Sequence, residues 1–175
     1  MKNQLNWLNR QKLKIMRGIC FKEFFFDLIA NGSKTVTRRM KDTYKVGEIL
    51  YIKEPYFLNE DGSVDYCYRG TTEHKWKNKL FMPQKYARMF IQIVDKRQEH
   101  LQEITEEECF LEGIKSKVVA GYFDKNIWSY YFNGVDLICY SDAIDAFAAL
   151  IDEINGRGTW ESNPVVTRYE FELLK

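Results

Sequence analysis

A six-residue segment near the start of the chain, KTVTRR, brings together an amine, two hydroxyls and two guanidiniums. In an extended strand Lys34 and Thr37 point to opposite faces, so their side chains meet only if the chain bends after Gly32. In such a bend Arg38 and Arg39 would lower the pKa of the lysine by charge repulsion, and a neutral lysine can act as a base. The alternative is an edge strand whose charges prevent aggregation. The segment therefore predicts either a charged edge or a site that faces a substrate.

Two glutamates stand at the ends of predicted elements. Glu54 follows the alternating residues Leu50 and Ile52 of a predicted strand and continues their inward face. An inward carboxylate at that position either lines a pocket or pairs with an arginine. Glu112 directly precedes Gly113, which marks the end of a predicted helix. The negative end of the helix dipole raises the pKa of a carboxylate there, which suits a general acid or base; the alternative is a solvated surface glutamate.

Two further segments contain prominent aromatic residues. The first, WKNKLFMPQKYAR, interleaves cations with rings and includes Trp76, Tyr86 and Arg88. Phosphate contacts together with stacking surfaces suit a single-stranded nucleic acid, and the alternative is a basic loop whose tryptophan packs on the core. The second, GTWESNPVV, contains Trp160 and Asn163 before the last predicted strand. There the favoured interpretation is a turn at Asn-Pro, with Trp160 closing one end of a barrel.

Charge is unevenly distributed along the 175 residues, although the net charge is only +1. The first 100 residues hold 20 Lys and Arg against 11 Asp and Glu, and the remaining residues hold 6 against 14. This asymmetry predicts a basic face for a polyanion such as RNA or DNA. The alternative is that the two halves interleave in the fold and their charges balance locally.

Cysteine, histidine and hydropathy patterns argue against several function classes. The four cysteines are scattered without a C-x-x-C pair, and the chain has two histidines. The sequence therefore predicts no disulfide framework, no metal site and no cofactor. No apolar run is long enough to span a membrane, and the first residues lack the apolar core of a signal peptide. We expect a cytoplasmic protein without a membrane partner.

The elements that must position these residues form a mixed α+β pattern. The strands show no regular βαβ alternation, which favours a small β-barrel or curled sheet with flanking helices. For the last helix, Ser141 is the predicted cap, and Ile144, Phe147, Ala148 and Ile151 form the predicted apolar stripe. The predicted helices are residues 20–32, 104–114 and 141–156, and the predicted strands include residues 46–57, 64–70, 87–97 and 165–174.

Five stretches occur in a recognisable order: LIANGSKTVTRR, YKVGEILYIKEPY, FMPQKYARMFIQIVDKR, LQEITEEECFLEGI and GTWESNPVVTRYEFE. They span nearly the whole chain, and together they resemble the ASCH domain family of the PUA-like superfamily. The likeness is greatest to the longer members that are often found in phages and prophages. The resemblance implies a PUA-like small β-barrel with flanking helices and a cleft that binds RNA or a modified nucleoside.

One compact branch of that family comprises amidohydrolases that remove the acetyl group from N4-acetylcytidine. The resemblance places the branch's lysine, threonine and glutamate on Lys34, Thr37 and Glu112, with Arg39 as the terminal arginine of the motif. It implies that the Thr37 hydroxyl, or a water that it holds, attacks the amide carbonyl. Lys34 then takes up the proton, Glu112 passes a proton to the leaving amine, and Arg38 or Arg39 holds a phosphate or the oxyanion.

The chain is longer than the members of the compact branch. It has a basic extension at residues 1–17, and the single domain at residues 18–175 has insertions near residues 55–82 and 114–140. The alternatives to an amidohydrolase are therefore a non-catalytic RNA-binding module and a phage accessory protein with a vestigial cleft. The predicted ligand-binding residues are Arg38, Arg39, Glu54, Trp76, Arg88, Trp160 and Asn163.

Overall fold

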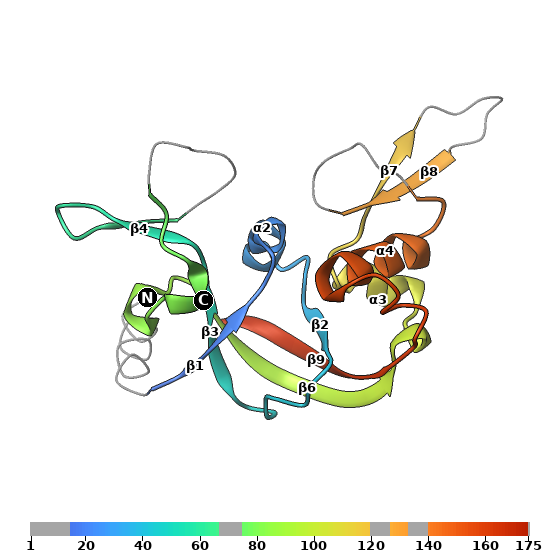
Figure 1. Ribbon diagram of the computed structural model, residues 1–175, viewed down its shortest axis with the longest axis horizontal. Helices are drawn as coiled ribbons and strands as arrows, with labels where there is room; N and C mark the ends of the chain where they lie inside the picture. Colours follow the sequence, from blue (N-terminus) through green and yellow to red (C-terminus); the bar gives the residue numbers. More distant parts are fainter. Residues whose placement is uncertain (1–14, 67–74, 120–126, 133–139, 175) are drawn as a thin grey trace.

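The structure of the protein is a computed structural model that describes residues 15–66, 75–119, 127–132 and 140–174. Nearly all of the predicted basic extension, residues 1–17, lies outside the described residues. Within the described ranges no helix is long and apolar enough to cross a membrane. The arrangement of a sheet with separate helices confirms the mixed α+β class (Figure 1).

In the described part of the chain, five strands form a curved sheet at the centre of the fold (Figure 1). The strand order is β1-β3-β6-β9-β2, with β1 and β3 parallel and all other neighbours antiparallel. The strands are β1 (Arg17–Cys20), β2 (Val36–Arg39), β3 (Ile49–Lys53), β6 (Phe90–His100) and β9 (Val165–Leu174). The two longest, β6 and β9, pair along most of their length and provide the floor of the sheet.

Alternating apolar residues place one face of β6 and β9 against the main core. Ile91 and Ile93 of β6 are buried there, as are Tyr169 and Phe171 of β9, which confirms the inward faces that their alternation predicts. A β-bulge follows Ile93 and shifts the register. Beyond the bulge the side chain of Glu99 is buried, on the opposite face of the sheet, where charged side chains replace apolar ones.

Helices cover the sheet, and local signals fix the ends of α3. The helical elements are η1 (Glu23–Phe25), α2 (Phe26–Ala30), η4 (Leu101–Glu103), α3 (Glu106–Leu111) and α4 (Ala143–Asn155). The Thr105 hydroxyl accepts a hydrogen bond from the amide of Glu108, which confirms the predicted start of α3. Glu112 follows as the last cap residue, and Gly113 has a φ of 104°. A side chain at Gly113 would also meet the ring of Phe25, because its Cβ would lie 2.9 Å from a ring atom.

The long helix α4 differs from its sequence prediction in its start and in its inward face. Its cap is Asp142, whose side chain accepts a hydrogen bond of 2.7 Å from the Asp145 amide, and not the predicted Ser141. Ile144 was predicted to face the core, but its side chain is 39% exposed. Phe147 and Ile151 are buried as predicted, and Ala146 and Leu150 complete the buried face, because packing selects a face turned slightly from the one that the periodicity indicates.

Two hairpins lie outside the central sheet: one follows β3, and the other follows α3 and lies beside α4 (Figure 1). One hairpin lies within residues 55–82 and the other within residues 114–140, the two ranges that the sequence identifies as insertions. The remaining elements are β4 (Tyr56–Leu58) paired with β5 (Val64–Tyr66), β7 (Lys115–Val119) paired with β8 (Ile127–Tyr131), η2 (Lys79–Phe81) and η3 (Gln84–Tyr86). Neither hairpin pairs with the central sheet in the described residues.

The sheet is open in the described residues, so of the two predicted forms the structure shows the curled sheet and not a closed small β-barrel. β1 and β2 are its two edges, and no backbone pairing joins them in that part of the chain. A side chain spans the gap instead: Nη2 of Arg39 on β2 donates a hydrogen bond of 2.8 Å to the carbonyl of Cys20 on β1. The edges stay apart because a cavity and its lining side chains occupy the space between them.

Candidate functional site

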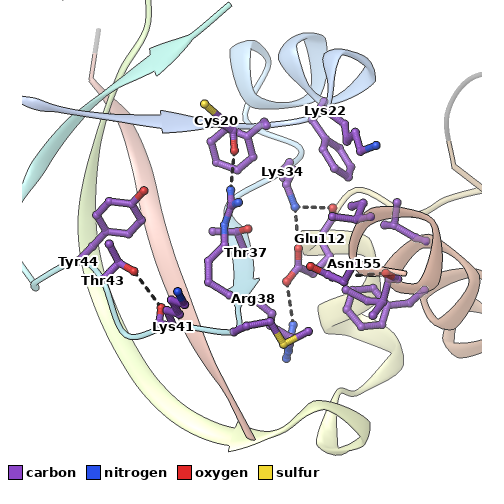
Figure 2. Close-up of a pocket in the computed structure, with 18 of the residues that line it drawn as sticks. Cys20, Lys22, Lys34, Thr37, Arg38, Lys41, Thr43, Tyr44, Glu112 and Asn155 are labelled. Atoms are coloured by element: carbon purple, nitrogen blue, oxygen red, sulfur yellow. Dashed lines mark hydrogen bonds and ion pairs between the residues drawn. The ribbon is translucent and has the colours of Figure 1, made fainter. Parts of the chain in front are cut away.

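A cavity of about 480 Å³ lies between the edge strands β1 and β2 and the helix α4 (Figure 2). All of the KTVTRR segment's charged residues line it, together with Thr37 and Glu112. The remaining lining residues are Cys20, Phe21, Lys22, Phe25, Met40, Lys41, Thr43, Tyr44, Lys79, Phe147, Leu150, Ile151, Ile154 and Asn155. The size is in the range of pockets that bind small organic ligands.

A bend after α2 brings the KTVTRR segment to the cavity. Gly32 has a φ of 80°, a conformation that favours glycine, and the Lys34 amide then donates to the carbonyl of Leu28 at 2.9 Å. β2 begins only at Val36, so Lys34 lies outside the strand. The direction of its side chain is therefore not set by the alternation of side chains along β2. β2 is also an edge strand, so side chains from both of its faces, including Thr37, reach the same cavity.

Lys34 is almost completely enclosed, with a relative exposure of 2%. Its Nζ donates to the Glu112 carboxylate at 2.7 Å, to the Glu112 carbonyl at 2.6 Å and to the Val36 carbonyl at 2.8 Å. These three acceptors match the three protons of the charged amine, and Glu112 favours that form. Burial opposes it more strongly and lowers the pKa of Lys34 below the usual 10.5, with Arg39 and Arg38 adding to the decrease.

Arg38 is enclosed by carboxylates on every side of its guanidinium. Nε donates to Glu99 at 2.7 Å, Nη1 donates to Glu112 at 3.2 Å, and Nη2 donates to Glu108. Its side chain is only 1% exposed. The structure therefore directs the donors of Arg38 into the protein, away from the ligand role that the sequence prediction gave it, and towards the Glu112 carboxylate.

Three arginines form a row across the sheet beneath this cluster. Arg38 on β2 pairs with Arg168 on β9, which pairs in turn with Arg97 on β6. Like charges directly opposite one another are unfavourable in a sheet unless counter-charges intervene. Glu99 and Glu108 provide these counter-charges: both contact Arg38 and Arg97, and Glu108 Oε1 also lies 2.9 Å from Arg168 Nε as an ion pair.

The three arginines of this row favour the ionised form of the Glu108 carboxyl group. Burial disfavours the ionised form of its carboxyl group, but Arg38, Arg97 and Arg168 outweigh that effect and lower its pKa. The row, its glutamates and the Lys34–Glu112 pair thus form one continuous network of ion pairs from the cavity to the surface.

Arg39 and Thr37 line the cavity with side-chain donors that remain available. Arg39 Nη2 binds the Cys20 carbonyl, and its guanidinium lies 5.1 Å from the centre of the Phe21 ring. Its Nε is buried and has no hydrogen-bond partner among the described residues. The Thr37 side chain is buried, and its hydroxyl makes no hydrogen bond within the described part of the chain. A buried donor such as Arg39 Nε is costly unless a ligand or water satisfies it.

Glu54 and Arg88 form a separate ion pair and do not line the cavity. Three hydrogen bonds of 2.7, 3.0 and 3.2 Å join the Arg88 guanidinium to the two oxygens of Glu54. The guanidinium also lies 4.4 Å from the centre of the Tyr66 ring. Burial raises the pKa of Glu54, and Arg88 partly offsets the rise. Of the two interpretations of Glu54, the structure shows the arginine pair.

The aromatic candidates also lie outside the cavity lining. Trp76 contacts Phe57 on the β4–β5 hairpin, with ring centres 6.4 Å apart. Trp160 packs edge-on against Phe147 of α4, at 6.1 Å between ring centres. Asn163 has a φ of 43°, and its side chain accepts a hydrogen bond from the main chain of the corner between β6 and α3. Trp160 and Asn163 thus hold the turn before β9.

Several residues of the site were missed by sequence reasoning. The ion-pair network also includes Glu99, Glu108 and Arg168. In the sequence, the sign that could have identified them is a charged residue inside a predicted strand or helix. Tyr44 and the apolar residues of α4 line the cavity without a distinctive local pattern. Among the described residues, no group of three or more His, Cys, Asp or Glu side chains could hold a metal ion.

No protein-family model matches the chain, and no curated protein matches it. Among solved structures, the chain is similar to the crystal structure of protein EF3133 from Enterococcus faecalis V583, whose title names the family model DUF984. The sequences are 13% identical, the alignment covers 97% of this chain and 88% of that chain, and the TM-score is 0.46. A likeness this distant transfers neither fold details nor function.

Proposed function

We propose that the protein is an amidohydrolase that removes an acyl group from the N4 amine of a modified cytidine, such as N4-acetylcytidine. One observation carries the proposal: a buried lysine, ion-paired with Glu112, shares a nucleoside-sized cavity with an unpartnered threonine hydroxyl. Burial lowers the pKa of Lys34, so a larger fraction of its amine is neutral than in an ordinary lysine, and only the neutral amine can accept a proton.

The roles of the residues follow from their donors and acceptors. The Thr37 hydroxyl adds to the acyl carbon and gives its proton to the neutral amine of Lys34. The carbon–nitrogen bond then breaks, and a proton passes from Lys34 through the Glu112 carboxylate to the leaving cytosine amine. Water hydrolyses the acyl ester on Thr37 by the same route and releases a carboxylic acid. Arg39, through its unpartnered Nε, stabilises the oxyanion that forms at the acyl oxygen.

The sequence resemblance supports the same assignment. The KTVTRR segment, the helix that ends at Glu112 and the closing strand resemble ASCH domains of the PUA-like superfamily, in which one branch hydrolyses N4-acetylcytidine. The curved open sheet, with the cavity between its two edge strands, supports this interpretation.

The test is release of acetate from N4-acetylcytidine, measured by chromatography of cytidine and by an acetate assay. We expect turnover by the wild type and a loss of at least about 100-fold in kcat for Lys34→Ala and Thr37→Ala, which remove acid–base and nucleophilic groups. Lys45→Ala is the matched control, because Lys45 is an exposed lysine outside the cavity. Absence of acetate release by the wild type, under conditions where a compact ASCH amidohydrolase is active, would refute the proposal.

A second candidate function is binding of RNA without hydrolysis. The observation that favours it is a set of cations on the cavity wall: Lys22, Lys41 and Lys79 line the cavity with Arg39. Such a cluster suits a phosphate backbone. Binding of a fluorescent single-stranded RNA should then weaken with salt, with a slope of about −0.7 in log K per phosphate contact. Binding without salt dependence contradicts this candidate.

A further inference from the structure

Basic side chains far outnumber acidic ones in the lining of the cavity. Six lysines and arginines line it, against a single carboxylate among the described residues, that of Glu112. Lys34 and Arg38 both pair with this carboxylate. The four remaining cations form no ion pair in the described part of the chain: Lys22, Arg39, Lys41 and Lys79. The cavity therefore carries a surplus of positive charge, which an anionic ligand would balance.

Three of these cations converge on the end of β1, at residues 20–22. Arg39 Nη2 donates to the carbonyl of Cys20 at 2.8 Å, and Lys79 Nζ donates to the carbonyl of Phe21 at 2.9 Å. The Arg39 guanidinium also lies 5.1 Å from the centre of the Phe21 ring. Lys22 is the next residue of the chain, so the three cations gather at one short stretch of backbone. The two carbonyl contacts hold Arg39 and Lys79 at the cavity.

Each of the three side chains keeps donors that a ligand can use. Lys79 uses one of its three amine protons in the contact with Phe21, and the Lys22 amine makes no hydrogen bond within the described ranges. Arg39 Nε is buried and also lacks a partner there. A phosphate monoester has about −1.5 to −2 charges and three acceptor oxygens, so it can accept from several cations at one point.

We propose that the cavity binds a nucleotide and that Lys22 and Lys79 hold its 5′-phosphate. The phosphate site follows from the cations, whereas the base, an N4-acylated cytosine, rests on the proposed hydrolysis. Lys22 and Phe25 are one turn of η1 apart, joined by a backbone hydrogen bond of 3.0 Å. The Phe25 ring in turn lies 4.4 Å from the Lys34 amine. The phosphate site is thus near the reacting pair but separate from it, and the substrate is a nucleotide in preference to a free nucleoside.

The first arm of the test measures dissociation constants of cytidine 5′-monophosphate and cytidine by calorimetry. Neither molecule has an acyl group, so their binding is independent of hydrolysis. We expect the monophosphate to bind about ten- to a hundredfold more tightly, because hydrogen bonds between charged groups are strong. Lys22→Gln and Lys79→Gln should each reduce this preference about fivefold or more. Lys77→Gln is the matched control, since Lys77 is an exposed lysine of the same segment outside the cavity lining, and the preference should persist.

The second arm compares kcat/KM for N4-acetylcytidine with and without a 5′-phosphate, and separates this inference from the proposed hydrolysis. A preference for the monophosphate that depends on Lys22 and Lys79 supports the phosphate site even if no acetate is released, a result that refutes the reaction alone. Hydrolysis of N4-acetylcytidine without any preference for the phosphorylated substrate overturns the phosphate site alone. Equal dissociation constants for the two ligands, or an equal loss of preference in Lys77→Gln, also overturn it. Binding of single-stranded RNA without a preference for the monophosphate overturns it in favour of a polynucleotide.

Discussion

The two oxygens of the Glu112 carboxylate bind two different cations: Oε2 accepts a hydrogen bond from Lys34 and Oε1 accepts one from Arg38. Arg38 is itself fixed by Glu99 and Glu108, so the rotamer of Glu112 is set by residues that do not approach the cavity centre. The arrangement makes Arg38 a positioning residue for the pair that the proposed reaction uses.

Replacement of Arg38 should therefore cost far more stability than replacement of Arg97, although both bind Glu99 and Glu108. Arg38→Gln leaves carboxylates buried against one another, and we expect a loss of about 3–5 kcal/mol in the free energy of unfolding. Arg97 is 49% exposed, so Arg97→Gln should cost about 1 kcal/mol or less. Urea denaturation measures both values. Similar losses for the two variants would show that burial of Arg38 does not determine its contribution.

The lowered pKa of Lys34 predicts how stability depends on pH. Below 10.5 an unfolded lysine is protonated, whereas the buried lysine releases its proton at a lower pH. Between the two pKa values the unfolded state binds more protons, so the free energy of unfolding rises with pH. Lys34→Met removes this contribution, and the stability of the wild type relative to the variant should increase with pH across that window. Denaturation of both proteins at several alkaline pH values tests this; a constant or falling difference contradicts it.

The two described cysteines should differ sharply in reactivity. Cys109 is fully buried, and burial raises the pKa of its thiol to about 12, whereas Cys20 is half-buried and lines the cavity. In a Cys67→Ser/Cys139→Ser background, Ellman's reagent at pH 8 should label Cys20 quickly and Cys109 only after unfolding. An N4-acylcytidine that occupies the cavity should slow the labelling of Cys20. Equal labelling rates for the two thiols would contradict the burial difference.

The Glu54–Arg88 pair predicts a different pH dependence. The folded pKa of Glu54 is raised, so between 4.5 and that value the folded state binds more protons, and stability falls as pH rises. Arg88 offsets this rise, so Arg88→Gln should lower the melting temperature more at pH 7 than at pH 5. In a Glu54→Gln background the effect of Arg88→Gln should lose its pH dependence. A loss that is equal at both pH values in the Glu54 protein would contradict the ion-pair explanation.

The local parts of the site could be predicted from the sequence. Gly32 indicated the bend that places Lys34 outside β2, and Gly113 indicated the end of α3, where Glu112 lies. These signals lie within a few residues of the side chains that they position. The alternation of residues that predicts an inward Glu54 is also a local signal. Pairing of Glu54 with an arginine was one of the two interpretations of that position.

The non-local parts could not be predicted. The row of Arg38, Arg97 and Arg168 depends on the register between three strands, and a shift of one residue would separate the three side chains. The choice of Asp142 over Ser141 as the start of α4 was equally hidden, since both residue types cap helices well and tertiary packing decides. The sequence could not show whether the sheet closes into a barrel, because nothing in β1 or β2 indicates how far apart these two strands lie.

The contact between Arg39 and the Cys20 carbonyl has a consequence for how this protein could diversify. A backbone ladder between β1 and β2 would hold the strands about 4.8 Å apart and leave no room for a ligand. In this protein the side chain of Arg39 connects the two strands instead. A single substitution at that position would change the aperture of the cavity while the β6–β9 floor and its core stay unaltered. The ligand range of the protein is therefore separable from the stability of its fold.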